Sequence, residues 1–259
     1  MLVEKRTLGQ SGIHASCLGL GTVKFGRNQE VKYPKTFSIP SDKQLEGLLD
    51  EARELGINLL DTAPAYGSSE QRIGQILTDR SNWILCTKVG EEFIDGKSFY
   101  NFSGQHTKTS IERSLKNLNT DYLDLVLVHS DGNDNTIINS TDCFEALSHL
   151  KDSGVIRAFG MSTKSVEGGI RAAELCDAVM VTLNPSNTQN IPVIKYALSK
   201  NKGVLVKKAL NSGHVGGESV KNNLNFAINT PGVTSVIIGT ISKDHLSANA
   251  SIINETFST

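Results

Sequence analysis

The chain has 259 residues, of which 26 are lysine or arginine and 27 are aspartate or glutamate, so its net charge is −1. This balance argues against a nucleic-acid binder, because such proteins gain most of their affinity by neutralising phosphates. The length is sufficient for one domain that buries its own core without disulfides or a structural metal. We therefore expect a single domain over residues 1–259 and no nucleic-acid partner.

Signals for export, membrane insertion and metal binding are weak. No apolar stretch reaches the roughly 18–20 residues that cross a bilayer, and the charged N-terminus lacks the apolar core of a signal peptide. We expect a cytoplasmic protein that does not bind a membrane. The six histidines show no metal-ligand spacing, so no bound metal is expected. The four cysteines include no C-x-x-C pair and are expected to be core thiols.

Short apolar runs alternate with longer amphipathic runs along the chain. Segments 2–8 and 13–16, joined by Gly9-Gln10-Ser11-Gly12, indicate a small N-terminal β-hairpin. Eight strands are expected after it, each followed by a helix. The strand and helix pairs are 18–20 with 42–55, 57–60 with 69–77, 83–86 with 107–117, 123–128 with 142–151, 156–161 with 165–174, 178–183 with 192–200, 204–206 with 218–229, and 235–238 with 242–253.

This alternation predicts an α/β fold with a parallel sheet. Strands such as 125–128 are continuously apolar, as expected for strands that are buried on both faces. Eight such units in a chain of this length predict a closed (β/α)8 TIM barrel, with a doubly wound open sheet as the alternative. Segments 90–105 and 130–141 are rich in glycine, asparagine and serine and are expected to be long loops after strands.

Polar residues follow several of the expected strands directly. Asp61, Lys88, His129 and Ser162 each come at the carboxyl end of an apolar run. Barrel enzymes build their active sites on this face, and neighbouring strands are about 4.8 Å apart. Each residue alone has an ordinary structural interpretation, as a helix cap, a solvated lysine or a structural histidine. Their joint placement, with Tyr66 on the loop after Asp61, indicates one catalytic group.

This group can move a proton at an oxygen atom. A tyrosine has an ordinary pKa of about 10, and a nearby ammonium such as Lys88 lowers that pKa by favouring the phenolate. Asp61 can hold Lys88 as an ion pair, and His129 can hydrogen-bond an oxygen beside Tyr66. The four residues would then face a carbonyl or an alcohol. They supply no hydride, so a redox cofactor must bring one.

The motifs around these residues resemble the aldo-keto reductase superfamily. They are residues 18–22 (LGLGT), 56–67 (GINLLDTAPAYG), 87–90 (TKVG), 121–125 (DYLDL) with His129, and 154–162 (GVIRAFGMS). The resemblance implies a barrel that reduces aldehydes or ketones with NADPH, or less often NADH. It implies Tyr66 as general acid, Lys88 as the modulator of its pKa, Asp61 as the anchor of Lys88, and His129 as the group that orients the carbonyl.

The expected cofactor site lies at the later strand ends. A glycine-rich stretch, 212–217, precedes a helix, and glycines and helix N-termini favour phosphates. From this local chemistry and the resemblance together, the cofactor-binding candidates are Gly21, Thr22, Ser162, Thr163, Lys207, Lys208, Gly213, His214, Ser242, Lys243 and Asn249. The family often has glutamine where Met180 stands, and an aromatic residue that stacks on the nicotinamide where Lys207 stands.

Three functional hypotheses remain open at this point. The first is an NADP-dependent oxidoreductase, with NAD as a possible cofactor, that reduces a small carbonyl substrate. The second is a Schiff-base lyase that uses Lys88, Lys207 or Lys208. The third is a noncatalytic nucleotide-binding barrel that acts as a sensor or partner subunit. The aromatic residues of segment 90–105 either line an apolar substrate pocket or cover the barrel rim, and the sequence leaves the oligomeric state open.

Overall fold

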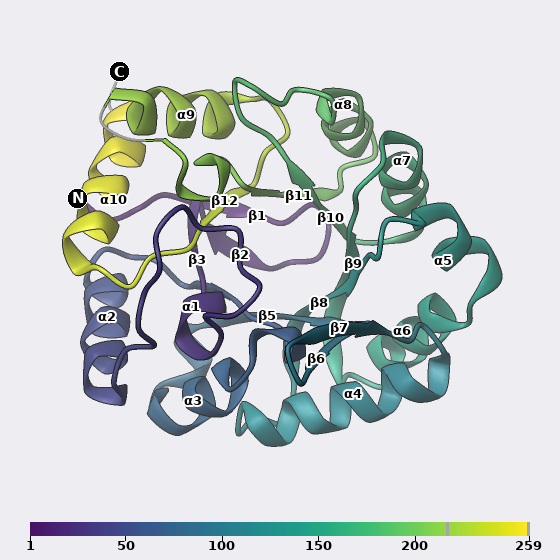
Figure 1. The fold of residues 1–259 in the computed structure, drawn as a ribbon. Coiled ribbons are helices and arrows are strands. Elements are labelled where there is room, and N and C mark those ends of the chain that lie inside the picture. Colours follow the sequence, from purple (N-terminus) through teal and green to yellow (C-terminus); the bar gives the residue numbers. More distant parts are fainter. Residues whose placement is uncertain (216–217, 258–259) are drawn as a thin grey trace.

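The computed structural model describes residues 1–215 and 218–257. Eight strands close into a barrel in the order β10-β11-β12-β3-β4-β5-β8-β9, and every neighbouring pair is parallel (Figure 1). The predicted (β/α)8 TIM barrel is therefore confirmed, and the open sheet is wrong. The barrel strands are β3 (Leu18–Gly21), β4 (Leu59–Asp61), β5 (Ile84–Val89), β8 (Leu123–His129), β9 (Ile156–Ser162), β10 (Ala178–Thr182), β11 (Gly203–Lys207) and β12 (Ser235–Ile238).

A ring of helices surrounds the barrel, and each strand leads to the helix predicted after it (Figure 1). These helices are α2 (Asp42–Glu54), α3 (Ser69–Ile76), α4 (Gly104–Asn117), α6 (Cys143–Asp152), α7 (Val166–Leu175), α8 (Ile191–Ser199), α9 (Glu218–Asn229) and α10 (Lys243–Phe257). Ser41 caps α2 through a capping box with Gln44. Gly56 and Gly154 follow α2 and α6 with φ of 80° and 77°, a conformation that favours glycine.

The core has two layers, as a filled barrel requires. One apolar cluster lies between the strands and the helices, and a second fills the barrel interior. The second includes Leu8 and Ile13 from the antiparallel hairpin of β1 (Lys5–Thr7) and β2 (His14–Ser16). Because Leu8 packs against Gly203, the first residue of β11, this predicted hairpin plugs the amino-terminal end of the barrel. The hairpin therefore does not cover the carboxyl-terminal end of the barrel, where barrel enzymes have their active sites.

Two segments expected to be loops contain regular structure. Segment 90–105 forms an antiparallel hairpin of β6 (Glu91–Ile94) and β7 (Lys97–Tyr100). Asp95 and Gly96 make its turn with φ of 50° and 78°, the two positive values that a tight hairpin turn favours. Segment 130–141 contains α5 (Asp134–Ser140), and the single-turn α1 (Val23–Gly26) follows β3. Segments 90–105 and 130–141 are therefore connections after strands as predicted, but they contain regular structure that the loop prediction did not include.

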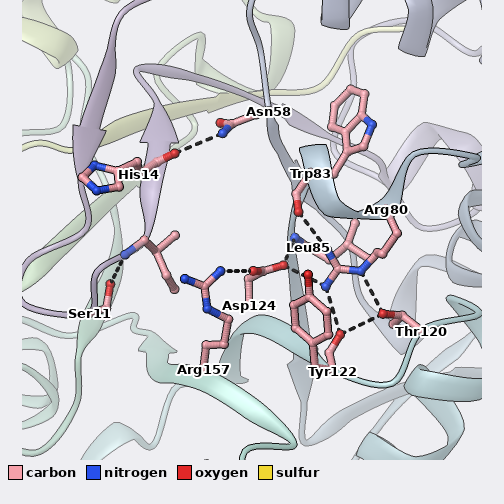
Figure 2. A network of polar contacts seen from close by, with 11 residues as sticks. Ser11, His14, Asn58, Arg80, Trp83, Leu85, Thr120, Tyr122, Asp124 and Arg157 are labelled. Atoms are coloured by element: carbon pink, nitrogen blue, oxygen red, sulfur yellow. Dashed lines mark hydrogen bonds and ion pairs between the residues drawn. The ribbon is translucent and has the colours of Figure 1, made fainter.

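A buried carboxylate ties three strands together near the amino-terminal end of the barrel (Figure 2). Asp124, only 1% exposed, accepts hydrogen bonds from the backbone N–H of Leu85 at 3.0 Å and from the guanidinium groups of Arg80 and Arg157 at 2.8 and 2.7 Å. Asp124 stands at the start of β8, whereas His129 ends that strand. Asp124 belongs to the 121–125 motif, and its contacts indicate a structural role. Over the described ranges, none of the helices is both long and apolar enough to cross a bilayer.

Candidate active site

The four predicted catalytic residues lie on one face of the barrel. Asp61 ends β4, Lys88 is the next-to-last residue of β5, and His129 ends β8. These strands are neighbours, with Asp61 paired to Cys86 and Lys88 paired to Leu127. Tyr66 ends a short 3-10 helix, Pro64–Tyr66, just after β4. The fold therefore brings the carboxylate, the ammonium, the phenol and the imidazole to the carboxyl ends of adjacent strands.

Lys88 and Asp61 form a buried ion pair. The Lys88 Nζ donates to Asp61 Oδ1 at 2.6 Å and to the carbonyl oxygen of Thr62 at 2.8 Å. Lys88 is 1% exposed and Asp61 is 4% exposed. Burial by itself lowers the pKa of Lys88, but the nearby Asp61 and Tyr66 outweigh it and raise the pKa above its ordinary value. Lys88 therefore stays an ammonium across the physiological pH range.

Tyr66 lies directly beside this ammonium. The Lys88 Nζ is 4.7 Å from the centroid of the Tyr66 ring. Burial raises the pKa of Tyr66, the charge of Lys88 lowers it and Asp61 raises it, and the net direction is upward. The expected action of Lys88 is present, but the expected net lowering of the pKa is not found, because burial disfavours the phenolate more than one paired ammonium favours it. Tyr66 is thus a protonated phenol near neutral pH.

His129 ends β8, which lies two strands away from β4 in the barrel, and its ring faces Tyr66. Their ring centroids are 6.3 Å apart, with an edge-to-face angle of 88°. On its other side, Nδ1 of His129 lies 2.8 Å from Oε2 of Glu91, at ion-pair distance but without the alignment of a good hydrogen bond. Burial lowers the pKa of His129, and Glu91 opposes this without cancelling it. His129 is therefore a neutral imidazole at neutral pH.

Glu91 is the residue that the sequence analysis missed. It begins β6, and the Ser98 hydroxyl on β7 donates to its Oε1 at 2.7 Å. Burial raises the pKa of Glu91, but His129, Ser98 and Arg27 outweigh it and lower the pKa to about 2. Arg27 also donates to the carbonyl oxygen of Ala65 at 3.0 Å and stacks on the Phe93 ring, which ties the hairpin to the helix that carries Tyr66. The Asp95-Gly96 turn was the sequence signal for this placement.

A second cluster lies at the ends of β9 and β11. The Lys207 Nζ donates to Ser162 Oγ at 2.7 Å and to the carbonyl oxygen of Thr163 at 3.1 Å. Burial is the main cause that lowers the pKa of Lys207 to about 7, and the charges of Lys208 and other lysines add to it. The structure thus brings three of the predicted cofactor residues together. Met180, buried in the barrel interior, provides no polar group beside them.

A polar cavity of about 390 Å³ lies between the loops after β10 and β11. Among the described residues that line it, Lys32 and Lys208 are cations, His214 is an imidazole and none is a carboxylate. The His214 Nε2 is 3.2 Å from the carbonyl oxygen of Lys32, and Gly213 lies near Tyr33, so the segment after β3 reaches this loop. A cationic lining of this kind fits an anionic group such as a cofactor phosphate. Gly216 and Gly217, also part of the expected glycine stretch, lie outside the described residues.

The remaining cofactor candidates are in two places. Thr22 follows Gly21 at the end of β3, and its hydroxyl donates to the carbonyl oxygen of Asp61 at 3.0 Å, so this side chain is engaged inside the protein. Ser242 accepts a hydrogen bond from the backbone N–H of His245 at 3.3 Å at the start of α10. Lys243 extends over Gly47 of α2, and Asn249 is buried in α10. Ser242, Lys243 and Asn249 thus belong to the start and the body of α10, whereas the catalytic group lies at the ends of β4, β5 and β8.

Comparisons with known proteins show which family the chain resembles. The model of the aldo/keto reductase family matches residues 17–223. The chain is 36% identical over 166 residues to the uncharacterized oxidoreductase YqkF of Bacillus subtilis, which covers 62% of this chain and 49% of that protein. It is 32% identical over 192 residues to D-arabinose 1-dehydrogenase of Saccharomyces cerevisiae, which covers 67% of this chain and 55% of that protein. The chain thus spans about half the length of the curated relatives that it matches.

Solved structures show the same fold. A Pseudomonas aeruginosa protein described as an aldo-keto reductase superposes with a TM-score of 0.91 at 47% identity, over 98% of this chain and 96% of that chain. The holo form of the aldo-keto reductase AKR11C1 from Bacillus halodurans superposes with a TM-score of 0.78 at 26% identity, over 97% of this chain and 91% of that chain.

Proposed function

Because the chain belongs to the aldo/keto reductase family, we propose that it is an oxidoreductase that reduces aldehydes or ketones to alcohols with a nicotinamide cofactor. The observation that carries the proposal is the buried Lys88–Asp61 pair next to the Tyr66 ring, with the His129 ring also facing the phenol. All four residues fall within the matched range. A structural ion pair alone would not need a phenol and an imidazole above it at the open end of a barrel.

Tyr66 is the proton donor in this proposal. Its raised pKa keeps the phenol protonated until a carbonyl oxygen that is gaining negative charge takes the proton. The Lys88 ammonium then stabilises the phenolate, and Asp61 keeps Lys88 charged and fixed. His129 contacts the same oxygen from the other side and limits its orientation. The cofactor, when bound, supplies the hydride.

The cofactor is proposed to be NADPH, with NADH as a weaker alternative. Lys32, Lys208 and His214 line the polar cavity and would hold phosphates of the cofactor. Ser162 and Thr163 would contact the nicotinamide end, since they lie at a strand end next to His129, to which Ser162 is paired. Lys243, at the first turn of α10, is the proposed contact for a 2′-phosphate, because helix N-termini favour anions.

A turnover assay tests the proposal. The purified chain would be given NADPH or NADH with a panel of small aldehydes, ketones and aldoses, and cofactor oxidation would be followed by absorbance. Aldoses belong in the panel because one relative is named a D-arabinose 1-dehydrogenase. Turnover that depends on both the carbonyl and the cofactor supports the proposal. Tight cofactor binding without turnover of any member would favour the noncatalytic barrel instead.

A further inference from the structure

The β6–β7 hairpin places a carboxylate against the ring of His129. Glu91 begins β6, and its Oε2 lies 2.8 Å from Nδ1 of His129. The Ser98 hydroxyl on β7 donates to the other carboxylate oxygen, Oε1, at 2.7 Å. Glu91 is 9% exposed, and the ring nitrogen that it faces is buried. The carboxylate is therefore held between Ser98 and His129, and no water molecule fits between it and the imidazole.

This contact determines which ring nitrogen of His129 carries the proton. A neutral imidazole has one N–H group and one nitrogen with a lone pair. A lone pair on Nδ1 would face the negative charge of Glu91 at 2.8 Å, whereas an N–H group there is attracted to that charge. The contact is bent, but at this distance the attraction still favours the N–H form. Nδ1 therefore carries the proton, and Nε2 carries the lone pair.

The other charged groups that face His129 keep its ring neutral. Lys88 on β5 and Lys207 on β11 both act against a positive imidazole, whereas Glu91 favours one. Tyr66, whose ring centroid is 6.3 Å from that of His129, is an uncharged phenol. Burial outweighs Glu91, so the pKa of His129 lies below its ordinary value. Near neutral pH the choice is therefore between the two neutral tautomers.

We propose that Glu91 is a positioning residue, which holds His129 in the Nδ1–H tautomer so that Nε2 accepts a hydrogen bond from a substrate hydroxyl. The His129 side chain is 20% exposed although Nδ1 is buried, so the accessible part of the ring lies away from Glu91. The inference rests on the proposed function, in which the oxygen beside Tyr66 is a carbonyl before reduction and a hydroxyl after it.

The two forms of the substrate differ in what they offer to Nε2. A hydroxyl can donate its proton to a hydrogen bond with the lone pair, whereas a carbonyl oxygen has no proton and would meet a second lone pair. The hydroxyl can accept a hydrogen bond from the Tyr66 phenol at the same time. The Glu91–His129 pair therefore makes the site favour the alcohol over the carbonyl compound.

Nitrogen NMR of the cofactor-free full chain tests the tautomer. Long-range 1H–15N correlation spectra, recorded above neutral pH, distinguish a protonated from an unprotonated ring nitrogen, and His129→Gln identifies the signals. In Glu91→Gln, the carbonyl oxygen of the glutamine can keep the hydrogen bond from Ser98 and its amide NH2 then faces Nδ1 as a donor. Glu92→Gln is the matched control, because Glu92 is the next residue of β6 but lies 3.3 Å from Nε2 of His106.

We expect the Nδ1–H tautomer of His129 in the parent chain and in Glu92→Gln, and the Nε2–H tautomer in Glu91→Gln. A parent chain in the Nε2–H form, or the same tautomer in the parent and Glu91→Gln, would overturn the inference. These spectra need no turnover, so a parent chain that turns over no substrate would count against the proposed function and leave the tautomer result standing.

Kinetics in both directions test the acceptor role of Nε2. With the alcohol and the carbonyl compound of one substrate pair, Glu91→Gln should raise the KM for the alcohol by about 2- to 10-fold, the usual net value of one hydrogen bond. The KM for the carbonyl compound should stay unchanged or fall, because Nε2 then offers it an N–H group. An equal rise in both KM values would overturn the acceptor role of His129.

Discussion

The Lys88 ammonium lies 2.6 Å from the Asp61 carboxylate, and both side chains are almost completely excluded from water. Much of the attraction between two buried charges is offset by the hydration that both lose when they leave water. Its value here is chemical, since it holds a permanent positive charge beneath Tyr66 at 4.7 Å from the ring centroid. Removal of either partner leaves the other charge buried and unpaired, so we expect it to lower the stability of the protein.

Asp61→Asn should therefore destabilise the protein by about 3–5 kcal/mol, because it leaves the Lys88 charge buried without its partner. The double variant Asp61→Asn/Lys88→Met removes both charges and should be more stable than Asp61→Asn alone. Chemical denaturation of the parent and the three variants measures this as a double-mutant cycle. A double variant that loses the sum of the losses in Asp61→Asn and Lys88→Met would show that the pair is not coupled.

Glu91→Gln should change the protonation of His129. Glu91 lies 2.8 Å from Nδ1 of His129 and raises the pKa of the imidazole against the effect of burial, so its neutralisation should lower that pKa further. Titration of the His129 ring protons by NMR measures the shift. Glu145→Gln is the matched control, because Glu145 contacts the exposed His149 instead. An unchanged or higher pKa for His129 would contradict the assignment of Glu91.

Glu91 also makes the stability depend on pH in the acid range. Its pKa in the folded protein is about 2, below the ordinary value of 4.5, so the folded state favours the charged carboxylate. The resulting stabilisation is fully present above 4.5 and disappears as the pH falls towards 2. The difference in unfolding free energy between the parent and Glu91→Gln should therefore shrink across this range. Denaturant titrations at several acid pH values measure it, and a difference that grows on acidification would contradict the prediction.

Asp124→Asn should affect stability and leave the chemistry intact. Asp124 joins Arg80, Arg157 and the backbone of β5 near the amino-terminal end of the barrel (Figure 2). Its replacement should cost about 3–5 kcal/mol, because two guanidinium groups lose a buried partner. Asp121→Asn, an exposed residue of the same motif, is the control and should be nearly neutral. Loss of turnover in the folded Asp124→Asn protein would mean that this end of the barrel takes part in catalysis.

Lys243→Ala should weaken NADPH binding more than NADH binding. Lys243 is in the first turn of α10, where a 2′-phosphate would meet both its ammonium and the helix N-terminus. Fluorescence titration with the two cofactors measures the effect, since Trp83 is the only tryptophan of the chain. Lys221→Ala, which removes an exposed lysine paired with Glu255, is the control. Equal weakening of both cofactors would remove Lys243 from the 2′-phosphate site.

Much of the fold and the catalytic group could be predicted from the sequence, for identifiable reasons. The strand and helix alternation is strong because buried parallel strands such as 125–128 are apolar throughout. Asp61, Lys88 and His129 could be placed together because each follows or ends such a strand. Several strands begin or end one to three residues away from their predicted positions, because apolar patterning does not mark where strand pairing stops.

Three features of the site depend on three-dimensional contacts, which the amino-acid sequence does not show directly. Glu91 is distant from His129 in the chain, and only the β6–β7 hairpin brings the two together. The net pKa shift of Tyr66 depends on how completely the phenol is buried, and the neighbouring lysine alone suggested the opposite direction. Lys207 was expected to contact the cofactor, and the inward direction of its Nζ towards Ser162 could not be read from its position.

Tyr66→Phe tests the central claim most directly. The change removes only the phenolic hydroxyl and keeps the ring beside Lys88. Tyr122→Phe, which lies near the other end of the barrel against Arg80 (Figure 2), is the matched control. Carbonyl-dependent turnover should fall by about 10²–10⁴-fold in Tyr66→Phe, the usual contribution of a positioned proton donor, while cofactor affinity and the turnover of Tyr122→Phe stay near parent values. Turnover by Tyr66→Phe at the parent rate would contradict the assignment of Tyr66 as the proton donor.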